Sequence, residues 1–350
     1  FLFVTDVSMK AAVPVIDLAP FLIDEGCVVG DAPTPSQLAT AAAIDRACRD
    51  HGFLFLQQFG SESQNAAAFA AAQRLFSLPE AHKAGEMKRV SPRTNTGYSP
   101  LRSESLNKSR AAENKEAFNV RARANRFDGC PAGFEEAAAA LWETAEFTAR
   151  RYAMASALAL GLPLDFFSRT LERMDLCTLR FLHYPPCDEH AEGVPPDEEG
   201  EDGRLPPLRV GEHTDFGLFT FLLLGEGAEG LQIKPVRGAE IGGAAGGEAG
   251  GWLELSVPPS ARGGAVVNTG ALLARWTNDV WRATAHRVIV PNAEVASRER
   301  YSIACFIDPD AEARIEVHPK FVAEGAAPRY TPTTGREYLL MKLREAQGPG

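Results

Sequence analysis

Short strand-like runs separated by turns fill the second half of this chain, and no other feature limits its fold as strongly. From Cys177 onward, runs rich in apolar and β-branched residues end repeatedly at Gly, Pro or Asn. These runs span 177–184, 218–224, 230–234, 252–255, 264–268, 283–290 and 300–307. Many short strands at such spacing favour a sandwich or a barrel built from β-sheets.

The first 175 residues carry helical periodicity instead. Helices are predicted over 35–50, Ser61–Phe76 and 134–161, where apolar residues recur at helical spacing. Two short apolar strands are predicted among them, over Val13–Leu18 and Phe53–Leu56. The two halves of the chain therefore differ in secondary structure.

We expect an α+β protein in which mainly helical residues 1–175 pack on a β core formed by residues 176–350. A final helix is predicted over Thr334–Glu345. Residues 188–204 are rich in Asp, Glu, Pro and Gly, and residues 236–251 form a Gly/Ala tract. Neither composition can build a core, so both segments are predicted to be loop insertions.

Composition narrows the setting and the partners. The net charge of -10 disfavours nucleic acid and anionic membrane as partners, because both reward a basic surface. Six cysteines without a Cys-x-x-Cys pair are typical of free thiols in a reducing compartment. No apolar run reaches the ~20 residues that a membrane-spanning helix needs. The first residues lack a basic leader, and Met9 is a candidate natural start after residues 1–8. We expect a cytoplasmic enzyme with a small-molecule substrate, as a monomer or alternatively a dimer.

His213, Asp215 and His286 form a candidate metal site. On a strand, residues i and i+2 face the same side, so His213 and Asp215 can converge on one ion. Two imidazoles and a carboxylate hold non-haem ferrous iron and leave positions open for substrate and oxygen. A zinc hydrolase could use the same set. The His-x-Asp pair alone is weak evidence, since single histidines in apolar strands are more often core residues.

Arg300-Tyr301-Ser302 follows the last of these histidines. Arg300 and Ser302 would share one strand face, and a guanidinium can bind a carboxylate through two charge-assisted hydrogen bonds. The competing interpretation is an exposed strand arginine. The serine two residues on favours an anchor for a carboxylate-bearing molecule beside the metal.

The order of the motifs is more specific than any one of them. His213-Thr-Asp-Phe-Gly is followed by Asn268-Thr-Gly, Trp276-Thr-Asn-Asp, Ala285-His-Arg-Val and Arg300-Tyr-Ser. Earlier landmarks are Val13-Pro-Val-Ile-Asp-Leu, His51-Gly-Phe-Leu-Phe, Leu78-Pro79, Gly97-Tyr98, Lys115-Glu116 and Tyr184-Pro-Pro-Cys. In these motifs the chain resembles, over nearly its whole length, the iron(II)/2-oxoglutarate-dependent dioxygenases of the isopenicillin N synthase-like family.

The resemblance implies a double-stranded β-helix (jelly-roll) core and a catalytic Fe(II) ion bound by His213, Asp215 and His286. It also implies that Arg300 and Ser302 hold the far carboxylate of 2-oxoglutarate. O2 is the implied second co-substrate, and ascorbate is an expected stimulant. The expected reaction hydroxylates, desaturates or cyclises a small molecule and releases succinate and carbon dioxide.

Two alternatives stay open from the sequence. An oxidase of the same family would need no 2-oxoglutarate, and its Arg-x-Ser would hold a substrate carboxylate instead. A catalytically silent binding protein could keep the same scaffold, since fold alone does not establish activity. Residues 97–98 and 118–126, together with the C-terminal segment, are expected to supply walls of the pocket.

Tyr184 and its neighbours combine a family feature with departures from the family pattern. The resemblance implies that the Tyr184 hydroxyl lies near the co-substrate. His183 replaces the first Tyr of the family's Tyr-Tyr-Pro, and Leu182 stands where many relatives have Asn. Ala271 stands where relatives commonly carry Asp. We expect the changes at 182 and 183 to alter contacts with the substrate or co-substrate.

Overall fold

The computed structural model describes residues 10–22, 32–87, 95–104, 113–122, 125–187, 208–234, 251–256 and 263–347. In these residues, eight strands form a large sheet. Its order is β2 (Val15–Ile16), β3 (Phe53–Leu56), β11 (Ala265–Thr269), β8 (Phe219–Leu224), β13 (Arg300–Ile307), β6 (Thr178–Tyr184), β5 (Glu116–Arg121) and β4 (Gly97–Ser99).

A smaller sheet faces the large one. Its described order is β1 (Lys10–Ala12), β10 (Leu253–Ser256), β9 (Leu231–Ile233), β12 (His286–Ile289) and β7 (Leu208–His213). From β6 to β13 the chain passes repeatedly between the sheets, because β6, β8, β11 and β13 are large-sheet strands and β7, β9, β10 and β12 are small-sheet strands. This crossing pattern is that of a jelly roll. A separate short ladder joins β14 (Arg314–Ile315) to β15 (Thr333–Thr334).

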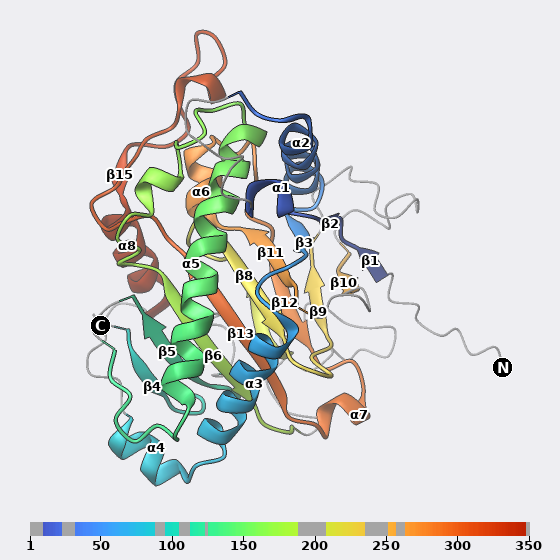
Figure 1. Cartoon of the computed structure of the whole chain (residues 1–350), viewed down its shortest axis with the longest axis vertical. Coiled ribbons are helices and arrows are strands. Elements are labelled where there is room, and N and C mark those ends of the chain that lie inside the picture. Colours follow the sequence, from blue (N-terminus) through green and yellow to red (C-terminus); the bar gives the residue numbers. More distant parts are fainter. Residues whose placement is uncertain are drawn as a thin grey trace, which may run out of the picture.

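Helices pack on the outer face of the large sheet. The described helices are α1 (Ala19–Leu22), α2 (Pro35–Asp50), α3 (Glu62–Phe76), α4 (Glu80–Glu86), α5 (Phe134–Ala159), α6 (Ala271–Trp276), α7 (Ala293–Ala296) and α8 (Gly335–Gln347), with 3-10 turns at Ser168–Thr170 and Pro319–Phe321. In Figure 1, α5 runs in front of β8, β13 and β6, with α3 beside it. Of the helices in the described residues, none combines the length and apolar character that a membrane crossing requires.

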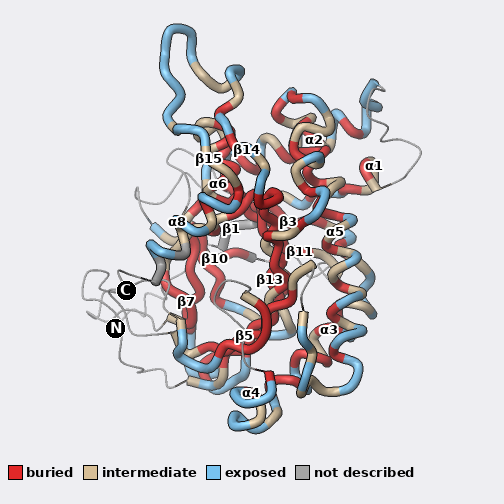
Figure 2. The backbone as a smooth tube through the Cα atoms, turned by 90° about the vertical axis from the view of Figure 1, so that its left-hand side faces the viewer, coloured by how far each residue is buried: buried red, intermediate tan, exposed pale blue. Residues whose placement is uncertain are grey.

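The large sheet is buried on both faces, as Figure 2 shows for the strands at the centre of the molecule. On β6, Leu179 and Phe181 pack among the helices, whereas Leu182 and Tyr184 pack in a second cluster between the two sheets. This alternation follows from the two-residue period of a strand. It explains why strands buried on both faces read as nearly continuous apolar runs. The inner face, between the sheets, carries the candidate site.

The predicted α+β fold with a jelly-roll core is confirmed, and the helices predicted at 35–50, Ser61–Phe76 and 134–161 appear within two residues of their expected ends. The strand expected over Val13–Leu18 is reduced to Val15–Ile16.

Several elements were not predicted, among them β4, β5, α4 and α6. Residues 1–175 also contribute strands to both sheets, because β1 joins the small sheet and β2 to β5 join the large one. The predicted insertions at 188–204 and 236–251 lie outside the described residues, apart from Gly251.

Candidate active site

The side chains of His213, Asp215 and His286 meet where β7 and β12 lie side by side. His213 ends β7, His286 begins β12, and the two are register partners. Both Nε2 atoms lie 3.8 Å from the same Asp215 Oδ1. One ligand atom from each of the three residues lies within 4.8 Å of the others. In the described part of the chain, no other set of three His, Cys, Asp or Glu side chains converges in this way.

The prediction that His213 and Asp215 share a strand is wrong. The strand stops at His213, because the chain must cross from the small sheet to β8 in the large sheet. The crossover is tight: a Cβ on Gly270 would lie 2.2 Å from the Gly217 carbonyl oxygen. The Asp215 carbonyl accepts a hydrogen bond from the Ala271 N–H at 2.7 Å. Asp215 therefore reaches the histidines through this crossover rather than through strand alternation.

Backbone carbonyls orient both imidazoles. His213 Nδ1 lies 2.8 Å from the Gly211 carbonyl oxygen, and His286 Nδ1 lies 3.2 Å from the Thr284 carbonyl oxygen. A carbonyl oxygen can only accept, so each Nδ1 carries the proton and donates it. Each Nε2 is then left with a free lone pair, which is the arrangement that metal-binding histidines adopt.

Two polar side chains orient the carboxylate. Asp215 Oδ2 accepts hydrogen bonds from Thr220 Oγ1 at 2.6 Å and from Asn268 Nδ2 at 2.7 Å. Burial by itself raises the pKa of Asp215, but the two histidines, Thr220 and Asn268 outweigh it and hold that pKa below its ordinary value. Burial, with the neighbouring His286, lowers the pKa of His213 to about 3. A neutral imidazole and an ionised carboxylate are the forms that bind metals, so these residues fit a divalent ion.

Arg300 is a buried cation on the inner face of β13, with 2% of its surface exposed. Its Nη1 lies 3.5 Å from Ser302 Oγ, and its Cζ lies 5.1 Å from the centre of the Tyr184 ring. Its Nε has no hydrogen-bond partner, and no ion pair is found for it among the described residues. Burial lowers the pKa of Arg300, yet an arginine in a protein keeps its charge. A buried charge without a partner is costly, so this position fits a carboxylate-bearing ligand.

A further pair of residues, Glu113 and Lys115, contacts the strand that carries His213, and this contact was not predicted from the sequence. The two side chains are buried and form an ion pair. Glu113 Oε1 also accepts a hydrogen bond from the Gly211 N–H at 3.1 Å, and the Gly211 carbonyl is the group that orients His213. Lys115-Glu116 stood out in the sequence as a family landmark, but no local pattern connects residue 113 to residue 211.

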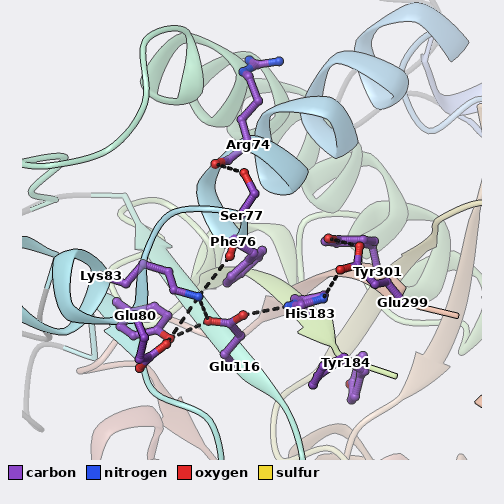
Figure 3. A network of polar contacts seen from close by, with 12 residues as sticks. Arg74, Phe76, Ser77, Glu80, Lys83, Glu116, His183, Tyr184, Glu299 and Tyr301 are labelled. Carbon is purple, nitrogen blue, oxygen red and sulfur yellow. Dashed lines mark hydrogen bonds and ion pairs between the residues drawn. The ribbon is translucent and has the colours of Figure 1, made fainter. Parts of the chain in front are cut away.

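His183 does not face the candidate site, contrary to the expectation from the sequence. It lies on the outer face of β6, where its ring stacks on Tyr301 at 4.7 Å and its Nδ1 lies 2.7 Å from Glu116 Oε1. Lys83 donates to Glu116 Oε2 at 2.6 Å, which completes the network in Figure 3. Strand alternation explains the difference, because Tyr184 next to His183 faces inward. Leu182 does face the space between the sheets.

Replacing Lys83 with methionine should destabilise the fold by about 3–5 kcal/mol, because it leaves the Glu116 carboxylate buried without its cation. Both side chains are at least nine-tenths buried. Equilibrium unfolding in urea measures the change. Lys342→Met is the matched control, since Lys342 forms an ion pair with a half-exposed Glu345, and such pairs contribute about 0–1 kcal/mol. If Lys83→Met lost no more stability than Lys342→Met, the buried network would contribute little to the stability of the fold.

Two family models match the chain. Residues 13–142 match the family described as non-haem dioxygenase in morphine synthesis N-terminal. Residues 175–309 match the 2OG-Fe(II) oxygenase superfamily, and this range contains the candidate site residues His213, Asp215, His286, Arg300 and Ser302.

Individual relatives agree with this assignment. The chain is 27% identical to the 2-oxoglutarate-Fe(II) type oxidoreductase hxnY of Emericella nidulans, over 96% of this chain and 91% of the relative. A full-length Neurospora crassa protein, crystallised with alpha-KG and 5-formyluracil, superposes with a TM-score of 0.74 at 25% identity, covering 98% of both chains. A 2OG-Fe(II) oxygenase family protein from Caulobacter crescentus gives a TM-score of 0.76 at 24% identity, covering 96% of this chain and all of that one. The chain belongs to the 2OG-Fe(II) oxygenase superfamily and is a 2-oxoglutarate-dependent Fe(II) dioxygenase.

Proposed function

We propose that His213, Asp215 and His286 bind the Fe(II) ion, and that Arg300 and Ser302 bind the far carboxylate of 2-oxoglutarate. The observation that carries this proposal is the convergence of two Nε2 lone pairs and one carboxylate oxygen, each held by a second contact. The buried Arg300 guanidinium in the same jelly roll supports the second part, because its Nε has no hydrogen-bond partner and no ion pair is found for it among the described residues.

The residues of the proposed active site have different roles. Asp215 brings a negative charge to the metal position, while Thr220 and Asn268 keep its second oxygen occupied. Arg300 would hold one end of 2-oxoglutarate by a bidentate ion pair, with Ser302 donating a further hydrogen bond. The bound iron supplies the oxidising chemistry, and the protein supplies orientation and protection from water.

Tyr184 belongs to the co-substrate end of this arrangement. Its ring is buried and packs over the Arg300 guanidinium, and the two residues are register partners on β6 and β13. We assign it the role of fixing the guanidinium plane and placing a hydroxyl near the co-substrate. The contact with an aromatic ring also lowers the cost of keeping this cation buried.

We place the reaction in the cytoplasm, on a small-molecule substrate. The described cysteines are all free thiols, namely Cys48, Cys130, Cys177, Cys187 and Cys305, with Cys27 outside the described residues. Free thiols are typical of a reducing compartment. The relatives support the class of reaction. The substrate must be inferred from the residues of this chain that line the inner face of the large sheet.

Oxygen consumption measured with and without 2-oxoglutarate tests the proposed function. Purified protein reconstituted with Fe(II) should consume O2 and release succinate only when 2-oxoglutarate is present, and an iron chelator should stop both. Oxygen consumption that proceeds with a substrate but without 2-oxoglutarate would support the alternative oxidase, in which Arg300 holds a substrate carboxylate.

A further inference from the structure

A pair of polar residues, Asn119 and Arg180, lies on the inner face of the large sheet. Asn119 on β5 is the register partner of Arg180 on β6. Arg180 pairs in turn with Ala304 on β13, and Ala304 pairs with Leu222 on β8. Residues directly opposite each other on neighbouring strands share one face of a sheet. Ala304 belongs to the cluster between the two sheets, so the whole row faces inward.

This row lies between the two ends of the proposed active site. Along β13, Arg300 stands two inward-facing positions before Ala304, and Phe306 stands one position after it. Phe306 is the register partner of Thr220, which holds the Asp215 carboxylate. The row of Asn119 and Arg180 therefore lies one inward-facing position, about 7 Å along the strands, from the row of Thr220, and Arg180 on β6 lies two strands, about 10 Å across the sheet, from Thr220 on β8.

Solvent reaches this part of the inner face. Leu222 and Phe306 are partly exposed, although both stand on central strands of the large sheet. Their neighbours on the outer face, Phe221 and Cys305, are fully covered by the helices. Arg180, the register partner of Asn119, is also partly exposed, so a ligand between the sheets can reach its guanidinium.

Asn119 has an unused hydrogen-bond acceptor at this position. The residue is 1% exposed, and its Nδ2 donates to Asn95 Oδ1 at 3.0 Å. Its own Oδ1 is buried and has no partner. An unpaired buried carbonyl oxygen costs free energy, and a donor on a ligand would remove that cost. The group that completes this site must therefore carry an N–H or O–H.

Arg180 adds donors without adding a net charge. Its guanidinium forms an ion pair with Glu104, so its charge is already balanced. No other hydrogen bond from this guanidinium is found among the described residues. A guanidinium offers five N–H donors, so some remain to bind a carbonyl oxygen. Because Glu104 already balances this arginine, a carboxylate or an ammonium on the ligand would bring a charge without a counter-ion to this position.

We propose that Asn119 and Arg180 select the primary substrate, and that they recognise a neutral amide, lactam or imide. Asn119 Oδ1 accepts from the ligand N–H, and the Arg180 guanidinium donates to the ligand carbonyl oxygen. Adjacent donor and acceptor atoms on one neutral group are what distinguish an amide from a ketone, an amine or an acid. This inference rests on the proposed function, because it assumes that the metal and 2-oxoglutarate occupy the positions assigned above.

Substrate-stimulated succinate release tests the inference. The probes are 2-piperidone and glutarimide, compared with cyclohexanone, piperidine and cyclohexanecarboxylate, which have similar size but lack one half of the amide or carry a charge. The lactam and imide should raise succinate release above the rate without a probe, and the three comparison compounds should not. Asn119→Leu should lower kcat/KM for 2-piperidone roughly ten- to hundredfold.

Asn65→Leu is the matched control, because Asn65 on α3 is also buried and also has an unpartnered Oδ1. It should leave kcat/KM for 2-piperidone near the wild-type value. The anaerobic binding of 2-oxoglutarate should be unchanged in both variants, which shows that they fold and load.

The outcomes separate the inference from the proposed function. If 2-oxoglutarate is turned over but neither amide stimulates it, or a comparison compound stimulates it as well, amide recognition is overturned and the proposed function stands. Equal effects of Asn119→Leu and Asn65→Leu also overturn it. If wild-type protein neither binds nor turns over 2-oxoglutarate, the proposed function itself has failed.

Discussion

Replacing Asp215 with asparagine should abolish turnover by removing iron from the protein. The amide can still accept the hydrogen bonds from Thr220 and Asn268, but it turns an N–H group toward the two imidazoles in place of a carboxylate oxygen. The loss of iron affinity should exceed the roughly 10- to 100-fold that outer contacts of a metal site contribute. Metal analysis after anaerobic desalting measures the loss directly.

Thr220→Val provides the graded control for this experiment. It removes one hydrogen bond to Asp215 and leaves all three proposed ligands in place. Its iron affinity should fall by about 10- to 100-fold, between the wild type and Asp215→Asn. If Asp215→Asn kept its full iron content, the Asp215 carboxylate would not be a ligand of the iron.

Replacing Arg300 with leucine should raise the KM for 2-oxoglutarate by at least about thirtyfold while iron still binds. Removing one partner of a buried charge pair costs about 2–5 kcal/mol, and thirtyfold corresponds to the lower end of that range. Arg300→Lys keeps a charge but loses the planar fork, so its KM should lie between the two. Steady-state succinate release at varied 2-oxoglutarate measures all three proteins.

Ser302→Ala should have a smaller effect in the same assay, because one hydrogen bond contributes about 0.5–1.5 kcal/mol. A KM for 2-oxoglutarate that is unchanged in Arg300→Leu would place the far carboxylate elsewhere. If the same variant instead raised the KM for the primary substrate, Arg300 would be the anchor of a substrate carboxylate.

Elements whose periodicity is local could be predicted from the sequence. The helix at Pro35–Asp50 carries its own signals, including a Thr34 capping box and a proline in its first turn. The strands at Phe53–Leu56 and Arg300–Ile307 appear as apolar runs because both of their faces are buried. By contrast, β5 contains Glu116 and Asn119, whose burial depends on partners from distant segments. These polar residues interrupt the apolar pattern, so the strand was not predicted.

The candidate site shows the same division. The ligand types and the Arg-x-Ser spacing were visible in the sequence, and the structure brings His213, Asp215 and His286 together. The path of the chain was not visible, because the crossover after His213 depends on close packing of Gly217 against Gly270. The contacts of Glu113 with Gly211 and of Asn119 with Arg180 were also beyond reach, since each joins segments far apart in the chain.

Anaerobic calorimetry with Fe(II) followed by 2-oxoglutarate tests the central assignment most directly. Wild-type protein should bind one equivalent of Fe(II) and then one equivalent of 2-oxoglutarate. Asp215→Asn should lose the iron step, and Arg300→Leu should keep the iron step but lose most of its affinity for 2-oxoglutarate. Iron binding that is unchanged in Asp215→Asn, or 2-oxoglutarate binding that is unchanged in Arg300→Leu, would contradict the assignment of these residues.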